Sequence, residues 1–113
     1  MNSLFSSLEE QLNCFAKAVH INAADKGFWQ QPPSTAESIA LMHSELSEAL
    51  EADRAGNPAD DKITEHSGVA AELADCIIRI LDFGEARGID VIGAMLAKAE
   101  FNKGRPYKHG KQY

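Results

Sequence analysis

The sequence predicts an all-α protein with four helices. Apolar residues recur at steps of three and four along most of the chain, and helix-capping or glycine signals bracket four such segments. No segment alternates apolar and polar residues as a half-buried strand does. With 113 residues, of which 44% are hydrophobic and 25% charged, the chain has the size and composition of one globular domain covering residues 1–113.

The first two helices are delimited by turn and capping residues. The first is expected from about Ser3 to Ala24, ending before Gly27, because apolar residues there keep the helical spacing. The following loop, "KGFWQQPPS", contains a Pro-Pro pair that no helix interior accommodates. A second helix is expected after Ser34, since "STAE" forms a capping box, and it should end near Arg54 before the Gly-Asn-Pro sequence at 56–58.

The second half of the chain repeats this organisation. Residues 57–66 are expected to be a polar linker, and a third helix should run from Ser67 to Arg87, closed by Gly88 in a left-handed conformation. Asp90 is a suitable N-cap for a fourth helix, which ends at Gly104 and leaves an irregular basic tail at about 105–113. Four helices on so short a chain favour a four-helix bundle-like arrangement completed by oligomerisation.

Composition limits the possible partners and location. The net charge of −6 argues against binding to nucleic-acid polymers or to a membrane surface. No export signal and no membrane span is recognisable, which favours the cytoplasm. Cys14 and Cys76 lie in apolar helical patterns without metal-type spacing, so both are expected to be buried thiols.

The second predicted helix concentrates carboxylates in "SELSEALEADR", residues 44–54. At the α-helical rotation per residue, Glu45 falls inside the apolar sector, Glu48 flanks it, and Glu51 lies on the outer side. The third helix places Glu72 and Asp75 at the margin of its own apolar sector. A solvated helix face does not explain acids in these positions.

Buried carboxylates require compensation. Two acidic i,i+3 pairs on neighbouring helices could ligate a hard divalent cation, Mg²⁺ or Mn²⁺, which prefers oxygen ligands. Protonation, or pairing with Arg79, is the structural alternative. A di-iron site is disfavoured because no histidine has a Glu three residues before it.

Basic and amide side chains follow on the fourth helix. Lys98 and Asn102 share one side of it at i,i+4, and Lys103 and Arg105 continue toward the tail. Such groups could hold phosphate oxygens. The alternative is an ordinary basic helix C-terminus favoured by the helix dipole.

These motifs together resemble the MazG-like all-α nucleoside triphosphate pyrophosphohydrolases. The family pattern is Glu-Glu-x-x-Glu, a spacer, and Glu-x-x-Asp; here "SELSE" at 44–48 precedes "ELAD" at 72–75 by twenty-three residues. The closing "KAEFNKGRPYKHGK" is similar to the end of small members. Ser44 stands where the family has its first Glu, which leaves the identity of the water-activating base open.

The resemblance implies Mg²⁺-dependent hydrolysis of a nucleoside or deoxynucleoside triphosphate to the monophosphate and pyrophosphate, in nucleotide-pool house-cleaning, by a homodimer or homotetramer. By position, the metal ligands would be Glu45, Glu48, Glu72 and Asp75, with Glu48 also a candidate catalytic base. The phosphates would be held by Lys98, Asn102, Lys103 and Arg105.

Two further interpretations stay open. The aromatic side chains of Phe28 and Trp29 offer a surface on which a base could stack, or else form a lid that packs on the bundle. The whole chain could also be a catalytically silent nucleotide-binding or protein-interaction module, or a relative specific for phosphoribosyl-ATP or dUTP.

Overall fold

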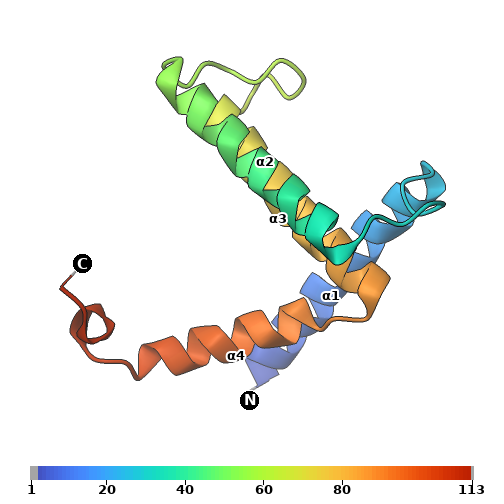
Figure 1. The fold of residues 1–113 in the computed structure, drawn as a ribbon. Helices are drawn as coiled ribbons and strands as arrows, with labels where there is room; N and C mark the ends of the chain where they lie inside the picture. The colour runs from blue at the N-terminus through green and yellow to red at the C-terminus, as the bar shows by residue number, and fades with distance from the viewer. Residues whose placement is uncertain (1–2, 113) are drawn as a thin grey trace.

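The computed structural model describes residues 3–112 and confirms the all-α prediction. Within this part of the chain, no β-strand occurs and four α-helices follow one another (Figure 1). They are α1 (Ser3–Asp25), α2 (Thr35–Arg54), α3 (Gly68–Arg87) and α4 (Val91–Lys103), followed by a short 3-10 helix, η1 (Tyr107–Gly110). None of these helices has both the length and the apolarity needed to cross a membrane.

The helix ends are formed by the capping residues expected from the sequence. Ser34 Oγ accepts a hydrogen bond from Glu37 N at 3.1 Å, while Glu37 Oε1 accepts one from Ser34 N at 3.3 Å, which completes the capping box of α2. Ser67 caps α3, and Asp90 caps α4 by accepting from Gly93 N. Gly88, with φ of 67°, closes α3 in the left-handed conformation that glycine adopts without steric cost.

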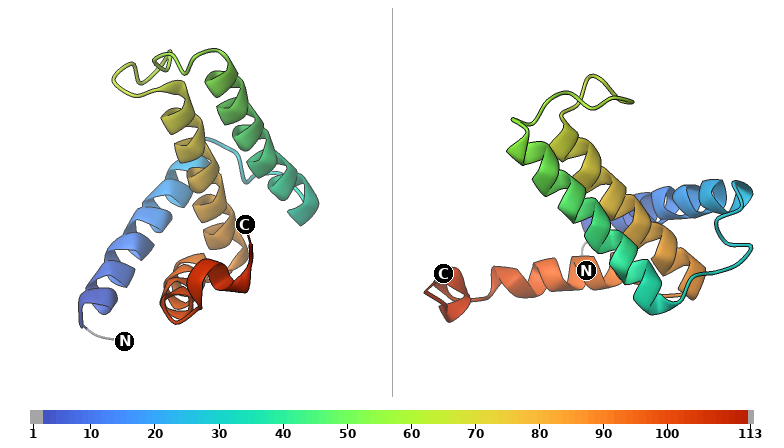
Figure 2. Two further views of the ribbon diagram at one scale, coloured as in Figure 1. Left: turned by 90° about the vertical axis from the view of Figure 1, so that its left-hand side faces the viewer. Right: turned by 45° about the horizontal axis from the view of Figure 1, so that its top comes forward.

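The helices are arranged around α3. The α2 and α3 helices form an antiparallel hairpin, α1 crosses the other side of α3, and α4 packs on α1 and α3 before it extends away from the hairpin (Figures 1 and 2). A small core joins α1, α3 and α4 through Ala16, Leu81 and Ile92. A single chain therefore has no continuous four-helix bundle; its closest helix pair is the hairpin, which carries the acidic residues.

Two details differ from the sequence-based expectations. Cys14 was expected to be buried but is exposed, because its side of α1 has no helix packed against it; Cys76 is buried as expected. The tail contains the 3-10 helix η1 where irregular structure was expected, and residue 113 lies outside the described residues. The linker before α3 contains no helix and is held by Asp60 Oδ2, which accepts from Lys62 N and Ile63 N.

Close packing where α3 meets α4 gives a first testable prediction. A Cβ added at Gly84 would lie 2.8 Å from Val91 Cγ2 and 3.2 Å from the Ile89 carbonyl oxygen. We expect Gly84→Ala to lower the free energy of unfolding by about 1–3 kcal/mol through overpacking, measured by chemical denaturation.

Gly104→Ala serves as the matched control. A Cβ at Gly104 meets nothing closer than 3.7 Å, and its backbone is right-handed. Its effect should stay within about 0.5 kcal/mol. Equal stability of the two variants would contradict the close contact assigned to Gly84.

Candidate metal centre

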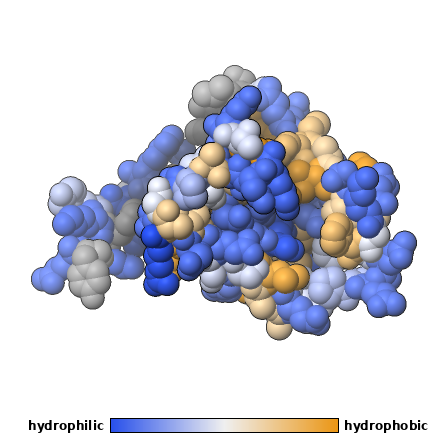
Figure 3. Space-filling model, turned by 90° about the horizontal axis from the view of Figure 1, so that it is seen from above, coloured by the Kyte–Doolittle hydropathy of each residue, from blue (hydrophilic) through white to orange (hydrophobic). Residues whose placement is uncertain are grey.

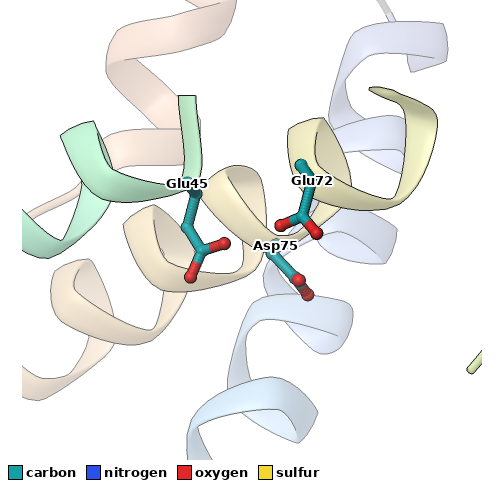
Figure 4. Close-up of side chains that lie close together, drawn as sticks. All are labelled: Glu45, Glu72 and Asp75. Carbon is teal, nitrogen blue, oxygen red and sulfur yellow. The ribbon is translucent and has the colours of Figure 1, made fainter. Parts of the chain in front are cut away.

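Three carboxylates converge between α2 and α3. Glu45 projects from α2, and Glu72 and Asp75 project from adjacent turns of α3 (Figure 4). One oxygen from each lies within 4.8 Å of the other two. Glu45 is only 7% exposed, which confirms the position inferred from its helical phase, whereas Glu72 is half-buried and Asp75 is exposed. The cluster therefore opens from the hairpin contact toward solvent.

The chain neutralises this cluster only in part. Arg79 Nε donates a hydrogen bond of 2.8 Å to Glu45 Oε1, so the ion pair considered as an alternative to a metal is present. The second oxygen of Glu45, Oε2, and Glu72 Oε2 are both buried and have no hydrogen-bond partner among the described residues. Buried acceptors without donors are costly. A hard divalent cation, which takes carboxylate oxygens, fits this donor set.

The electrostatics of the cluster follow from its crowding. The proximity of the Glu48 carboxyl group, followed by burial and by Glu45, raises the pKa of Glu72 to about 7. Burial alone would raise the pKa of Glu45, but the hydrogen bond from Arg79 and the positive charge of its guanidinium contribute to lowering it overall. Burial and the charge of Glu45 raise the pKa of Asp75. Glu72 is therefore the carboxyl group of the cluster that, without a cation, keeps a proton up to about neutral pH.

Glu48 and Ser44 lie beside the cluster in different ways. The exposed side chain of Glu48 lies one turn after Glu45 on α2. Its carboxyl group approaches that of Glu72, but Glu48 is not one of the three residues that converge. Ser44 Oγ donates to the Leu41 carbonyl oxygen at 2.6 Å, so its hydroxyl is engaged within α2. Of the two, only Glu48 presents a proton-accepting group to the cluster.

The acidic cluster borders a cavity of about 460 Å³ between α1, the following loop and the hairpin. Glu45 and Asp75 contribute to its wall, and so do Phe28 and Trp29 from the loop. Apolar side chains line much of the rest, including those of Val19, Leu41, Met42 and Ile78. The sequence predicted a role for the acidic residues Glu45 and Asp75 and for the aromatic residues Phe28 and Trp29. It did not indicate that both groups line the same cavity.

Asp82 is a cavity residue to which sequence analysis assigned no role. Trp29 Nε1 donates to both carboxylate oxygens, at 2.9 and 3.1 Å, and His20 Nδ1 lies 2.7 Å from Asp82 Oδ1. The His20 and Trp29 rings meet edge to face with centroids 5.7 Å apart. Asp82 therefore ties α1 and the aromatic loop to α3. Its position two turns after Asp75 was a signal that it points toward the same side.

The four residues predicted to bind phosphate lie elsewhere. Lys98, Asn102, Lys103 and Arg105 are all exposed, and none lines this cavity. Lys98 Nζ and Arg105 Cζ each lie 5.8 Å from the Phe101 ring centroid, and Lys103 pairs with Glu100 at 3.2 Å. The α4 helix, which carries the first three and precedes Arg105, extends away from the hairpin, so one chain does not bring these residues to the acidic cluster (Figures 1 and 2).

The chain matches no protein-family model, no curated protein and no solved structure. The ligands that the site can bind are therefore inferred from its own geometry. Three carboxylates with two unpartnered oxygens can hold a divalent cation, and the adjoining cavity can accept a small molecule that carries an aromatic group.

The raised pKa of Glu72 predicts how stability depends on pH in the absence of divalent cations. In the folded state the Glu72 carboxyl group has a pKa of about 7, compared with an ordinary value of 4.5. Proton binding at Glu72 therefore contributes fully to the free energy of unfolding below pH 4.5, and this contribution is lost as the pH rises through 7. We expect the free energy of unfolding, measured by chemical denaturation across this range, to fall less in Glu72→Gln, which stays neutral, than in the wild type.

Glu51→Gln is the control for this measurement. Glu51 lies exposed on the outer side of α2, away from the cluster, so its variant should keep the wild-type pH profile. Identical profiles for Glu72→Gln and the wild type would show that Glu72 holds no proton near neutral pH.

Proposed function

We propose that this protein is a Mg²⁺-dependent nucleoside triphosphate pyrophosphohydrolase of the MazG-like type. The observation that carries the proposal is the convergence of Glu45, Glu72 and Asp75 beside a cavity whose wall includes two of them, Glu45 and Asp75, together with Phe28 and Trp29. The substrate is a nucleoside or deoxynucleoside triphosphate, and the products are the monophosphate and pyrophosphate. Mn²⁺ is an alternative metal, because it accepts the same oxygen ligands.

The carboxylates supply the metal site in this proposal. Glu45, Glu72 and Asp75 hold the cation, and Arg79 fixes the orientation of Glu45 through its 2.8 Å hydrogen bond. When bound there, Mg²⁺ would neutralise the polyphosphate and polarise the reacting phosphoryl group. Glu45 Oε2 and Glu72 Oε2, the two buried oxygens without hydrogen-bond partners, would be available to it as ligand atoms.

Glu48 is assigned the role of general base. Its exposed carboxylate stands beside Glu72, so it can take the proton of a water molecule that attacks the α-phosphorus, while the bond to the β-phosphate oxygen breaks. The hydroxyl of Ser44 cannot substitute, because it is a weak base and donates to Leu41 within the helix. Glu48 therefore takes the place of the acid that the family pattern has at position 44.

The cavity is assigned to the nucleoside. Trp29 is held by two hydrogen bonds to Asp82, which gives an immobile aromatic face, and Phe28 is 71% exposed beside it. Stacking on such a face is worth about 1–3 kcal/mol per base and tolerates different bases. The aromatic face would therefore contribute to the affinity for a nucleobase but would not discriminate between different nucleobases.

Lys98, Asn102, Lys103 and Arg105 are assigned to the phosphates of the substrate. Their distance from the acidic cluster within one chain implies that a neighbouring copy in a homodimer or homotetramer provides them. Cationic groups at this position stabilise the charge that develops on the leaving pyrophosphate.

A catalytically silent nucleotide-binding module is the second candidate. The observation that favours it is Ser44, which stands where the family pattern has a glutamate, so the chain has one acid fewer than that pattern. Such a module would bind Mg²⁺ and nucleotide at the same cavity without releasing pyrophosphate.

Turnover distinguishes these functions. In a pyrophosphate-release assay with a panel of nucleoside and deoxynucleoside triphosphates, the wild type should show Mg²⁺-dependent activity. Asp75→Ala, which removes a metal ligand, should reduce it about a hundredfold or more, the scale on which loss of one transition-state-stabilising group acts. Glu51→Ala, on the outer side of α2, should keep it. Nucleotide binding without turnover would favour the silent module.

The phosphate assignment has its own test. Lys98→Ala should lower kcat/KM about tenfold or more by removing a charge near the pyrophosphate, which corresponds to at least about 1.4 kcal/mol. Lys111→Ala removes an equally exposed charge beyond η1 and should have little effect. Equal losses in the two variants would show that only the general charge of the tail matters.

A further inference from the structure

Most polar groups on the cavity wall already have a partner or a role. The polar and charged side chains that line it are those of Asn22, Ser38, Glu45, Asp75, Arg79 and Asp82. Glu45 and Asp75 belong to the acidic cluster, and Arg79 donates to Glu45. Asp82 accepts from Trp29, and Asn22 is exposed to water. Ser38 is therefore the wall residue whose polar group has neither a partner nor an assigned role.

Ser38 is buried on α2, one turn after the N-cap Ser34. The residue is 7% exposed, and its hydroxyl oxygen is shielded from solvent and has no hydrogen-bond partner among the described residues. On the face of the molecule in Figure 3, hydrophilic side chains predominate at the surface, where water can bond to them. The hydroxyl of Ser38 has no such access to water, and a buried polar group without a partner costs free energy of folding.

Ser44, on the same helix, shows the usual arrangement of a helical serine. Its hydroxyl donates to the Leu41 carbonyl oxygen at 2.6 Å, within the helix. Ser38 makes no such bond, although its backbone N–H donates to the Ser34 carbonyl oxygen at 2.9 Å in the regular way. A serine side chain has one χ angle, and rotation about it can turn the hydroxyl toward the cavity. The hydroxyl of Ser38 is thus available to a molecule that occupies the cavity.

We propose that Ser38 is the residue that discriminates between nucleobases, through a hydrogen bond from its hydroxyl group to the polar edge of the base. The inference rests on the assignment of the cavity to the nucleoside, and it applies to the hydrolase and to the silent module alike. Stacking on Trp29 is open to every base. A hydrogen bond depends on which atoms the edge of the base presents, and a mismatched base leaves the buried hydroxyl without a partner.

A hydroxyl group reserved for a ligand has different effects on folding and on binding. Ser38→Ala removes no hydrogen bond from the ligand-free chain, so the free energy of unfolding, measured by chemical denaturation, should not fall. The same substitution removes one hydrogen bond from the nucleotide complex, so affinity should fall. A hydroxyl group that served the fold would give the reverse pattern, with lower stability and unchanged affinity.

Isothermal titration calorimetry of the full chain with Mg²⁺ tests the inference. The probes are the α,β-imido analogues of dATP, dGTP, dCTP and dTTP, which resist cleavage between the α- and β-phosphates, and tripolyphosphate, which has no base. Ser38→Ala should weaken binding of the preferred nucleotide about three- to tenfold, as expected for one neutral hydrogen bond, and should bring the affinities for the bases closer together. Its affinity for tripolyphosphate should match that of the wild type.

Ser44→Ala is the matched control, because it removes a hydroxyl group that is bonded within the same helix; it should keep the wild-type affinities. Unchanged affinities in Ser38→Ala, or an equal loss for every base and for tripolyphosphate, overturn the inference and leave the proposed function standing. A wild type that binds the nucleotides without preference also overturns the inference alone. A wild type that binds none of them overturns the inference together with the proposed function.

Discussion

Negative charge held inside a helix–helix contact is the constraint on which the rest of this structure depends. Glu45 is buried against α3, where a carboxylate is unfavourable unless other groups compensate it. Arg79 compensates one of its oxygens, and the crowding displaces the pKa values of Glu45, Glu72 and Asp75 in different directions. A core built only for stability would place a leucine at position 45. The fold instead keeps an anionic site at the middle of its closest helix pair.

The same hairpin separates two kinds of chemistry by its two sides. Carboxylates, those of Glu45, Asp75 and Asp82, line the cavity on the α1 side together with the aromatic loop. Aliphatic side chains occupy the outer side. Helical periodicity alone produces this separation, because residues three, four or seven apart share a side. The cavity wall and the exposed aliphatic side chains therefore occupy different sides of the same forty helical residues.

The sequence allowed local features to be predicted well and long-range ones poorly. Capping by Ser34, Asp90 and Gly88 depends on neighbouring residues, so the helix ends were predictable. The burial of Glu45 followed from its phase among apolar residues. The exposure of Cys14 and the direction of α4 depend on which helices pack together, and no local pattern encodes that choice. The bridging role of Asp82 depends on contacts with residues 53 and 62 positions away, which a single sequence does not reveal.

The hydrogen bond between Trp29 and Asp82 has a practical consequence. Trp29 is the only tryptophan of the chain, and its indole lies on the cavity wall, bonded to an anion. Indole fluorescence responds to nearby charge, to water and to stacked aromatic rings. The emission of the unmodified protein is thus an intrinsic optical signal from this cavity, free of contributions from any other tryptophan.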